Sequence, residues 1–359
     1  MKNINIVLTG DKNYTKILGI AMTSILENIS DDCRARFFIF HQGWLQDDIK
    51  EIDKLKMKYN CEINYIAMEN YLKLFDFVND SNFRNKWITI SCLFRLLMFN
   101  ILPDDVDICF YIDGDMIVNC DLSKITLPEN KMFGAVIEPI AMQRREKLLS
   151  HCFELEEFYR FKKNPLEFPY FNAGFYIVDI KLAKQMGIFE QCINILKNRP
   201  NLPYADQDVL NIIFSQNNIE KVYFLPPEYN VFATINYNDT IFDRLPYPAE
   251  KLDYAYNNPQ IIHYVAGNKP WINQNVKNYY NIWWKYYKIS PWGKDAFSKK
   301  LKTGWNSNPK FGKMPILYLI FNEIFSLKNI YVNDKKHKVV TILGIKIKIR
   351  VKNLKAETK

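Results

Sequence analysis

The stretch DICFYIDGDMIV, residues 107–118, is an apolar run that two carboxylates interrupt, Asp113 and Asp115. Its apolar lead-in is typical of a buried β-strand. Burying an unpaired carboxylate is costly, and two neighbouring ones also repel each other, so the pair predicts a bound cation. In an extended chain the two side chains would face the same way, and Gly114 would leave the backbone open to close approach. Two oxygen ligands at a strand end suit Mg²⁺ or Mn²⁺, whereas a simple surface turn is the alternative.

Strand-like and helix-like segments alternate on both sides of this stretch. Apolar runs predict strands, and apolar residues at helical spacing predict the helices between them. The predicted strands are 3–10, 34–40, 61–68, 107–118, 131–139, 169–180 and 261–267, and the predicted helices are 14–28, 45–59, 87–102, 205–214 and 276–289. This order predicts an α/β fold in which helices cover a mainly parallel sheet. Sites in such sheets lie at the carboxyl ends of the strands.

The last predicted strand carries a second group of candidate residues, in IIHYVAGNKPW (261–271). His263 ends the strand, where its imidazole can add a nitrogen ligand to the same metal. Lys269 lies in the following turn and can meet a phosphate as a point charge. A core histidine followed by a surface turn is the plainer alternative. The turn TGDKN (9–13) follows the first strand and belongs on the same edge of the sheet.

A third group of candidates is split between two segments, PYFNAGFYIVDI (169–180) and YADQDVLN (204–211). Asn172 can bond sugar hydroxyls, and the small residues after it let a ligand approach the backbone. Asp206, Gln207 and Asp208 begin a helix, and two acids with an amide suit the hydroxyl-rich face of a hexose. Equally, Asp206 can cap the helix while its two neighbours face solvent.

Composition indicates a globular protein of the reducing cytoplasm. Of the 359 residues, 48% are hydrophobic and 24% charged, which is neither a disordered nor a fibrous composition. The start lacks the apolar core of a signal peptide, and no run of about 18 apolar residues predicts a membrane span. Seven cysteines without a C-x-x-C pair predict reduced core thiols, at positions 33, 61, 92, 109, 120, 152 and 192.

The net charge of +9 is concentrated at one end of the chain. Residues 299–359 hold fifteen Lys/Arg against three acids, whereas residues 1–298 hold 33 basic and 36 acidic residues. From Ile345 the chain alternates isoleucine or valine with lysine or arginine, which predicts a strand. We expect this basic region to bind an anionic membrane surface rather than nucleic acid. The alternative is a hairpin that packs its isoleucines on the body of the protein.

Taken together, the ordered segments TGDKNY, SCLFRLLM, YIDGDMIV, FNAGFYIVDI, ADQDVLN and HYVAGNKPW resemble glycosyltransferase family 8. The resemblance covers roughly residues 3–285 and is strongest to bacterial lipopolysaccharide and lipooligosaccharide α-galactosyl- and α-glucosyltransferases. It implies a GT-A fold over residues 1–285, with residues 286–359 as a basic helical and β-hairpin appendage. It also implies a UDP-hexose donor, Mn²⁺ (with Mg²⁺ as the substitute), retention of the α configuration and a lipid-linked oligosaccharide acceptor. The enzyme would then work on the cytoplasmic face of the inner membrane.

The resemblance also implies a role for individual residues. Asp113, Asp115 and His263 match the metal ligands, and Gln207 with Asp206 match the candidates for catalysis. Glu138 matches an acidic position on the sugar side. The nucleotide-sugar pocket would comprise Thr9, Gly10, Asp11, Asn13, Arg95, Asp113, Gly114, Asn172, Ala173, Asp206, Gln207, Ala266, Gly267 and Lys269. One departure is that Ala266 stands where the family usually has glycine, with Gly267 next, which changes the expected diphosphate loop.

Other enzymatic and non-enzymatic functions compete with this prediction. In one alternative, the enzyme transfers its sugar to another surface glycan or to a protein. A sugar nucleotidyltransferase also uses paired aspartates, but TGDKNY is a poor match to its glycine-rich basic loop. A non-catalytic sugar- or membrane-binding module gives no reason for Asp113, Asp115 and His263 to occur together. Because a carboxamide is a poor nucleophile, we expect front-face attack guided by the leaving phosphate, with Gln207 stabilising the sugar.

Overall fold

The structure is a computed structural model of the chain. It describes residues 1–79, 90–139, 169–200, 202–216, 218–233, 247–265, 269–272 and 278–293, and the backbone of 325–332, 335–342 and 345–350. The sequence has a polar, irregular stretch at residues 141–170, which we expect to be an excursion from the sheet. It lies almost wholly outside the described residues, as does Cys152. The other six cysteines are free thiols, as predicted. Among the helices described, none combines the length and the apolar character that crossing a membrane requires.

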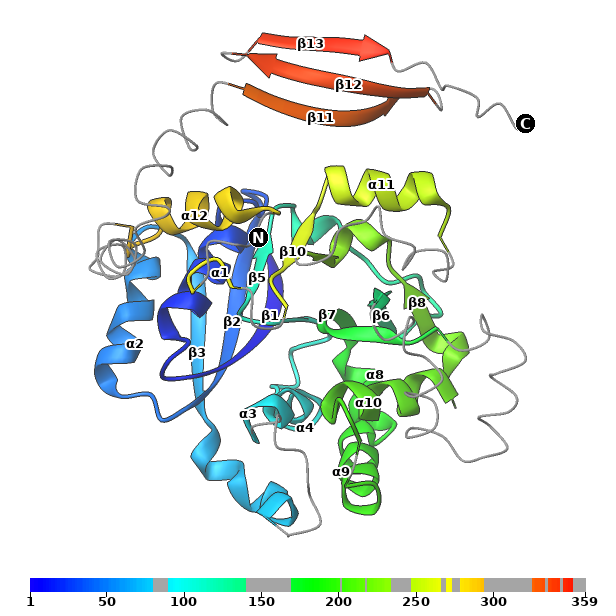
Figure 1. Ribbon diagram of the computed structural model, residues 1–359. Coiled ribbons are helices and arrows are strands. Elements are labelled where there is room, and N and C mark those ends of the chain that lie inside the picture. The colour runs from blue at the N-terminus through cyan, green and yellow to red at the C-terminus, as the bar shows by residue number, and fades with distance from the viewer. Residues whose placement is uncertain are drawn as a thin grey trace.

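A seven-stranded sheet in the order β3-β2-β1-β4-β7-β6-β8 forms the centre of the protein (Figure 1). Its strands are β1 (Lys2–Asp11), β2 (Cys33–Gln42), β3 (Cys61–Ala67), β4 (Ile108–Ile112), β6 (Phe133–Ile137), β7 (Phe171–Asp179) and β8 (Val222–Phe224). Four of the neighbouring pairs are parallel, and β7 runs antiparallel to both β4 and β6. The predicted mainly parallel α/β sheet is therefore confirmed.

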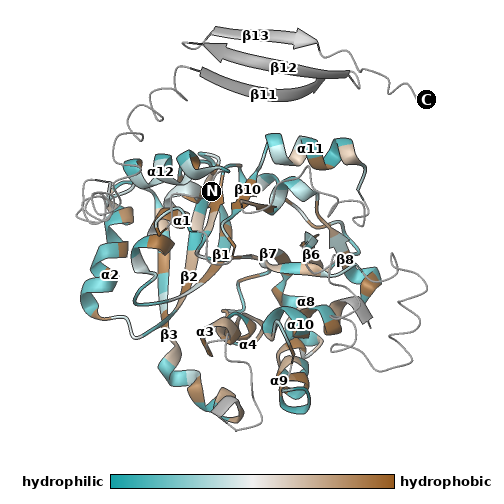
Figure 2. Ribbon diagram, viewed as in Figure 1, coloured by the Kyte–Doolittle hydropathy of each residue, from teal (hydrophilic) through white to brown (hydrophobic). Residues whose placement is uncertain are grey.

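Helices cover both faces of this sheet because its strands are apolar on both sides. One face packs against α1 (Thr15–Leu26), α2 (Gln46–Asp53) and α12 (Tyr280–Ile289). The other packs against α3 (Ile90–Leu93), α4 (Met98–Ile101), α8 (Ile180–Gln185), α9 (Ile188–Asn198) and α10 (Asp206–Asn211). In β1, Ile6 and Leu8 face the first layer and Val7 faces the second, which is the period of two that a strand imposes. Figure 2 shows apolar central strands and helices such as α2 of mixed polarity.

The helix predicted over residues 87–102 is present, but its middle turn is tightened. Residues 87–89 lie outside the described part, and the rest forms α3, a 3₁₀ turn at Phe94–Leu97 and α4, one directly after the other. Further 3₁₀ segments are Lys54–Met57, which continues α2, Met68–Asn79, Leu122–Lys124, Ile219–Lys221 and Pro227–Tyr229, and a π-helical segment, Ile212–Gln216, follows α10. The tightened turn matters for the site because it holds Arg95, which is buried beneath the ends of β4 and β7.

The chain does not continue as one strand through Asp113 and Asp115, as the sequence suggests. It turns there, with the Met116 N–H donating to the Asp113 carbonyl at 3.1 Å, and enters a second sheet. That sheet has the order β5-β10-β9, from β5 (Met116–Val118), β10 (Ile261–His263) and β9 (Val231–Phe232). Helix α11 (Ala249–Asn257) lies between β9 and β10 in the chain. The turn thus places both aspartates where two sheets meet, with His263 opposite Met116.

Three strands near the end of the chain form an antiparallel sheet, β11 (Phe325–Val332), β12 (Lys335–Ile342) and β13 (Ile345–Arg350). The strand predicted from Ile345 onward is confirmed. Residues 294–324 lie outside the described part of the chain. The division into a domain of residues 1–285 and an appendage of 286–359 stays a prediction.

Candidate active site

Asp113, Asp115 and His263 converge although 150 residues separate the first from the last. Within the described residues, one ligand atom from each lies within 4.8 Å of the others. His263 Nε2 is 3.3 Å from Asp115 Oδ1 and 3.8 Å from Asp113 Oδ2. Strand β10 brings the imidazole there by pairing with β5, directly after the turn that holds the aspartates. Two carboxylates and an imidazole are a suitable donor set for Mn²⁺ or Mg²⁺.

Hydrogen bonds fix which oxygen of Asp113 faces the other two side chains. Its Oδ1 accepts from the Tyr111 hydroxyl at 2.7 Å and from Arg95 Nη2 at 2.9 Å. Because Tyr111 gives its one proton to Asp113, the Thr9 hydroxyl must donate to Tyr111 in their 3.0 Å contact. With Oδ1 so engaged, Asp113 presents Oδ2 toward His263.

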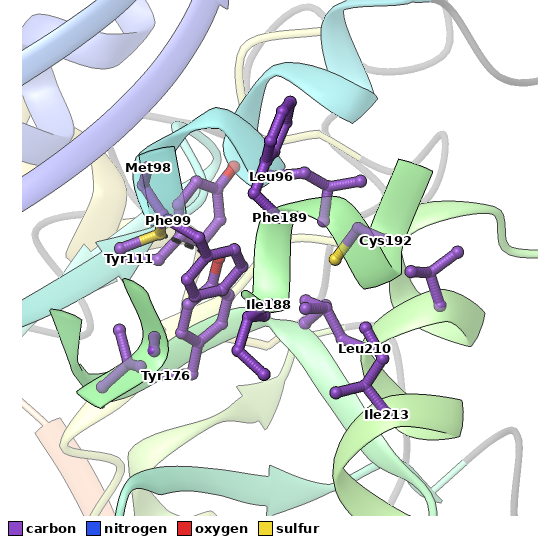
Figure 3. Packing of buried hydrophobic residues seen from close by; sticks show 14 of the residues in the cluster. Leu96, Met98, Phe99, Tyr111, Tyr176, Ile188, Phe189, Cys192, Leu210 and Ile213 are labelled. Atoms are coloured by element: carbon purple, nitrogen blue, oxygen red, sulfur yellow. Dashed lines mark hydrogen bonds between the residues drawn. The ribbon is translucent and has the colours of Figure 1, made fainter. Parts of the chain in front are cut away.

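The hydrophobic core holds Tyr111 in place. Its ring stacks on Tyr176 with centroids 5.0 Å apart and 17° between the planes, and Tyr176 donates to Met98 Sδ. Figure 3 shows both tyrosines among Met98, Phe99 and Ile188. Packing of the sheet against α4 and α9 therefore sets the direction of the hydroxyl that orients Asp113.

Asp115 is bound from the opposite side by Lys269. The ammonium contacts Asp115 Oδ2 and donates to the Tyr264 carbonyl at 2.5 Å, so it ties the segment after β10 to the turn. Burial opposes ionisation of Asp115, but His263 and Lys269 outweigh it and hold its pKa well below the usual range. Asp115 is therefore a carboxylate at neutral pH, as a metal ligand must be. Lys269, predicted to meet the diphosphate, is only 8% exposed.

Arg95 lies under the site and bridges both halves of it. Its guanidinium is 3.0 Å from Asp206 Oδ2, donates to the Ala173 carbonyl at 2.6 Å, and lies over the Tyr111 ring. Burial lowers the pKa of Arg95, but Asp113 and Asp206 raise it well above its usual value. Each of the three guanidinium nitrogens thus has a partner within the protein. Contact of Arg95 with a donor diphosphate stays a prediction.

Asp206 does not cap its helix. Ala205 occupies the N-cap position with φ of 35°, a strained conformation for a residue with a β-carbon, and Asp206 begins α10 facing Arg95. Burial raises the pKa of Asp206 to about 6 despite the opposing effect of Arg95. Asp208 is fully buried rather than solvated, and accepts from the Tyr170 hydroxyl at 2.5 Å and the Tyr204 N–H at 2.6 Å. The alternative of a simple capped, solvated helix start is wrong.

Asn172 and Gln207 form one buried network with Glu138. Asn172 Nδ2 donates to Glu138 Oε2 at 2.6 Å and to Gln207 Oε1 at 3.0 Å. Gln207 Oε1 also accepts from the Ala173 N–H at 3.0 Å. The carbonyl oxygen of Gln207 therefore already has two donors, which argues against its acting as a free nucleophile.

The predicted nucleotide residues lie at the carboxyl end of β1. Thr9, Gly10 and Asp11 are half-exposed and Asn13 is exposed, and Asp11 Oδ1 accepts from the Asn13 N–H at 2.8 Å. Gly114, between the two aspartates, packs against Leu18 of α1, the helix that follows β1. This edge therefore adjoins the aspartates. Ala266 and Gly267 lie outside the described residues.

Two further residues of the site were not identified from the sequence in their actual roles. A β-carbon on Gly174 would overlap His263 Cε1 and lie 3.0 Å from Asp113 Oδ2, so this glycine makes room for protein side chains rather than for a ligand. Asn230, 3% exposed, contacts His263 Nδ1 at 3.2 Å. In sequence, Asn230 is only an amide before the two apolar residues of β9, and no local pattern marks it.

Comparison with known proteins agrees with this geometry. The chain is 25% identical over 299 residues to general stress protein A of Bacillus subtilis, covering 80% of this chain and 94% of that one. It is 27% identical to lipopolysaccharide 1,2-glucosyltransferase of Escherichia coli K12, covering 82% and 80%. The solved structure of the galactosyltransferase LgtC with donor and acceptor sugar analogues superposes with a TM-score of 0.64 at 19% identity, over 83% of this chain and all of that one.

The similarity to LgtC shows the fold alone, which is of the GT-A type. The model of "Glycosyl transferase family 8" matches residues 5–275, about three quarters of the chain and every described residue of the site. The chain thus belongs to glycosyltransferase family 8 and is an enzyme that transfers a sugar.

Proposed function

We propose that this enzyme transfers galactose or glucose from a UDP-sugar to a lipopolysaccharide or lipooligosaccharide core, with retention of the α configuration. The observation that carries the proposal is the convergence of Asp113, Asp115 and His263 at the edge of the sheet where Thr9 and Asp11 are half-exposed. A candidate metal-binding triad beside a predicted nucleotide edge suits a diphosphate leaving group. The E. coli relative and a Salmonella typhimurium relative are named for glucosyl and galactosyl transfer, which supports a hexose.

Members of this family use a divalent metal, and we infer Mn²⁺ for this chain, with Mg²⁺ as the substitute. Asp113 Oδ2, Asp115 Oδ1 and His263 Nε2 would hold it. Bound there, the cation would neutralise the charge that develops on the departing diphosphate. Lys269 already neutralises Asp115 from its other side and would be the nearest additional positive charge for the diphosphate.

The roles of the remaining residues are proposed from the family resemblance. Thr9, Gly10, Asp11 and Asn13 would contact the nucleoside, and Asn172 with Glu138 the transferred sugar. In our mechanism the bond from the anomeric carbon to the UDP oxygen breaks and the bond to the acceptor oxygen forms on the same face. The acceptor proton passes to the leaving phosphate. Gln207, whose oxygen is held by two donors, stabilises the sugar from the other side.

This mechanism forbids a covalent sugar–enzyme intermediate. We expect mass spectrometry of the enzyme quenched during turnover to show no glycosyl adduct on Gln207 or Asp206. An adduct on either residue would replace front-face attack by double displacement, while leaving the assigned donor and metal in place.

The proposed function predicts UDP release and mass gain under defined conditions. The purified enzyme is offered UDP-galactose, UDP-glucose and UDP-N-acetylglucosamine with Mn²⁺, with and without truncated lipooligosaccharide. We expect an added hexose of about 162 Da in one of the first two reactions, with a turnover on the order of 10 per second, and its loss on chelation with EDTA. Readdition of Mn²⁺ should restore it.

The outcomes separate the competing functions. Release of pyrophosphate from a nucleoside triphosphate and sugar phosphate would indicate a nucleotidyltransferase. Sugar transfer to a protein or another surface glycan, with none to lipooligosaccharide, would replace the acceptor. Binding without any turnover would leave only a non-catalytic module, and transfer unaffected by EDTA would remove the metal from the proposal.

We further propose that the basic region after residue 298 holds the enzyme on the cytoplasmic face of the inner membrane, where a lipid-linked acceptor lies. Its charge supports this, since each lysine or arginine near an anionic surface contributes about 1 kcal/mol. Deletion of residues 310–359 should move the protein from the membrane fraction to the soluble fraction, and should lower its cosedimentation with anionic vesicles. Unchanged fractionation would favour a sheet that packs on the enzyme instead.

A further inference from the structure

We propose that Asn230 is a positioning residue that selects the tautomer of His263, and that a buried chain of amides sets the orientation of Asn230. The inference rests on the proposed metal site. It concerns which nitrogen of the imidazole carries the proton, because only the unprotonated nitrogen can bind a metal.

The argument starts from Gly174, whose backbone N–H can only donate. It donates to the side-chain oxygen of Asn172 at 2.9 Å, which settles which end of that amide is the oxygen. The nitrogen end then faces acceptors, namely Glu138 Oε2 and Gln207 Oε1. Gln207 is oriented independently, since its oxygen accepts from the backbone N–H of Ala173. Two backbone donors therefore fix the direction of the Asn172 amide.

Asn172 in turn orients Asn230. The Asn172 oxygen accepts from Asn230 Nδ2 at 2.8 Å. If the Asn230 amide were reversed, two carbonyl oxygens would face each other in a site where Asn230 is 3% and Asn172 7% exposed. Buried acceptors that face each other without a donor between them are costly. The amide of Asn230 must therefore present its oxygen to His263.

The last step places the proton on His263. Asn230 Oδ1 is 3.2 Å from Nδ1, so a hydrogen bond between them requires Nδ1 to be the donor. In the neutral ring this leaves Nε2 with its lone pair, on the side of Asp113 and Asp115. Phe232 packs edge-on against the imidazole at 5.4 Å and limits its rotation. The two sheets thus cooperate, since β7 provides Asn172 and the residues preceding β9 provide Asn230.

The first test reads the tautomer directly. The chain has four histidines, so a protein labelled with ¹⁵N-histidine gives a simple spectrum, in which the signals that vanish in a His263→Gln sample belong to His263. At a pH high enough for the ring to be neutral, we expect proton-bearing Nδ1 and bare Nε2. The substitution Asn230→Leu should shift the signal toward the Nε2–H form. A wild-type ring protonated on Nε2, or a tautomer unchanged in Asn230→Leu, would overturn the inference.

The second test measures Mn²⁺ affinity by electron paramagnetic resonance. Asn230→Leu should weaken binding by about 10–100-fold, as is usual when the partner of a metal-binding histidine is lost. Asn230→Asp loses the donor to Asn172 Oδ1 but keeps an acceptor for Nδ1–H, so it should bind Mn²⁺ more tightly than Asn230→Leu and less tightly than the wild type. The matched control is Asn5→Leu, which removes a buried amide from β1 that donates to the Ile108 carbonyl, away from the site. It should leave Mn²⁺ affinity unchanged.

These results are distinguishable from failure of the proposed function. If wild-type protein binds no Mn²⁺ or transfers no sugar, the proposed function fails, but the tautomer of His263 still answers the question about Asn230. Equal Mn²⁺ affinity in the wild type and in folded Asn230→Leu would refute the positioning role while leaving the metal site intact.

Discussion

Gly174→Ala is expected to weaken Mn²⁺ binding by about 100-fold or more and to reduce sugar transfer in parallel. The new methyl group would overlap the His263 ring, lie 2.8 Å from Asn172 Oδ1 and 3.0 Å from Asp113 Oδ2. None of these neighbours can move aside easily, because the ring is buried and both oxygens belong to hydrogen-bonded side chains. The methyl group must therefore push the imidazole away from the aspartates. Isothermal titration with Mn²⁺ measures the loss.

The matched control for this substitution is Gly134→Ala in β6. A β-carbon there would lie 2.8 Å from Ile177 Cγ2 and 3.0 Å from Leu127 Cδ2, so it overpacks the core without approaching the site. Both substitutions should cost about 1–3 kcal/mol of unfolding free energy. Only Gly174→Ala should lose Mn²⁺. If both variants bind Mn²⁺ as the wild type does, Gly174 is needed for packing and not for the metal site.

The substitution Arg95→Leu should lower the free energy of unfolding by about 3–5 kcal/mol, because it strands the buried carboxylate of Asp206 and the half-buried one of Asp113. Asp113 would lose the Nη2 donor, and Asp206, whose pKa burial already raises, would lose its partner. Mn²⁺ binding should weaken as well, since Asp113 loses one of the two hydrogen bonds that turn its Oδ2 toward His263. Urea unfolding and Mn²⁺ titration measure the two effects.

A different outcome is expected if Arg95 serves mainly to bind the donor diphosphate. The variant would then be as stable as the wild type and show only a raised KM for the UDP-sugar. Arg95→Lys, which keeps the charge but not the planar fork, should recover part of the stability. Arg36→Leu is the matched control, because Arg36 also pairs with two acids, Glu62 and Asp105, but near solvent. Exposed pairs of this kind contribute roughly 1 kcal/mol or less.

The predicted metal ligands and the sheet could be found from sequence because their signals are local. A buried strand shows itself by its apolar run, and carboxylates that interrupt it, as at Asp113 and Asp115, are costly enough to need an explanation. His263 was identified for the same reason, as a polar residue at the end of an apolar run. Parallel strands bring such ends to one edge whatever their distance in the chain, so these three residues were expected to meet. They do meet, but His263 reaches the aspartates from the second sheet, through the antiparallel pairing of β10 with β5.

The signals of the remaining site residues are not local. Asn230, Tyr111 and Gly174 matter only for what they touch, and their partners lie between two and 89 residues away in the chain. The turn at Asp113 could not be foreseen either, because β5 leaves the main sheet to pair with β10, a distant strand. Similarly, a regular α-helix and a helix with a 3₁₀ turn, such as the one that carries Arg95, have the same apolar spacing.

By itself the sequence determined the alternation of strands and helices, the edge at which ligands bind and the residue types that would hold a cation. Those follow from hydrophobic burial and from the cost of burying charge, which act on each segment separately. Tertiary structure alone decided which oxygen of Asp113 faces His263, which nitrogen of His263 faces the aspartates, and that Arg95 lies under the site between Asp113 and Asp206. Hydrogen-bond direction depends on partners from several elements, and only the folded chain brings those partners together.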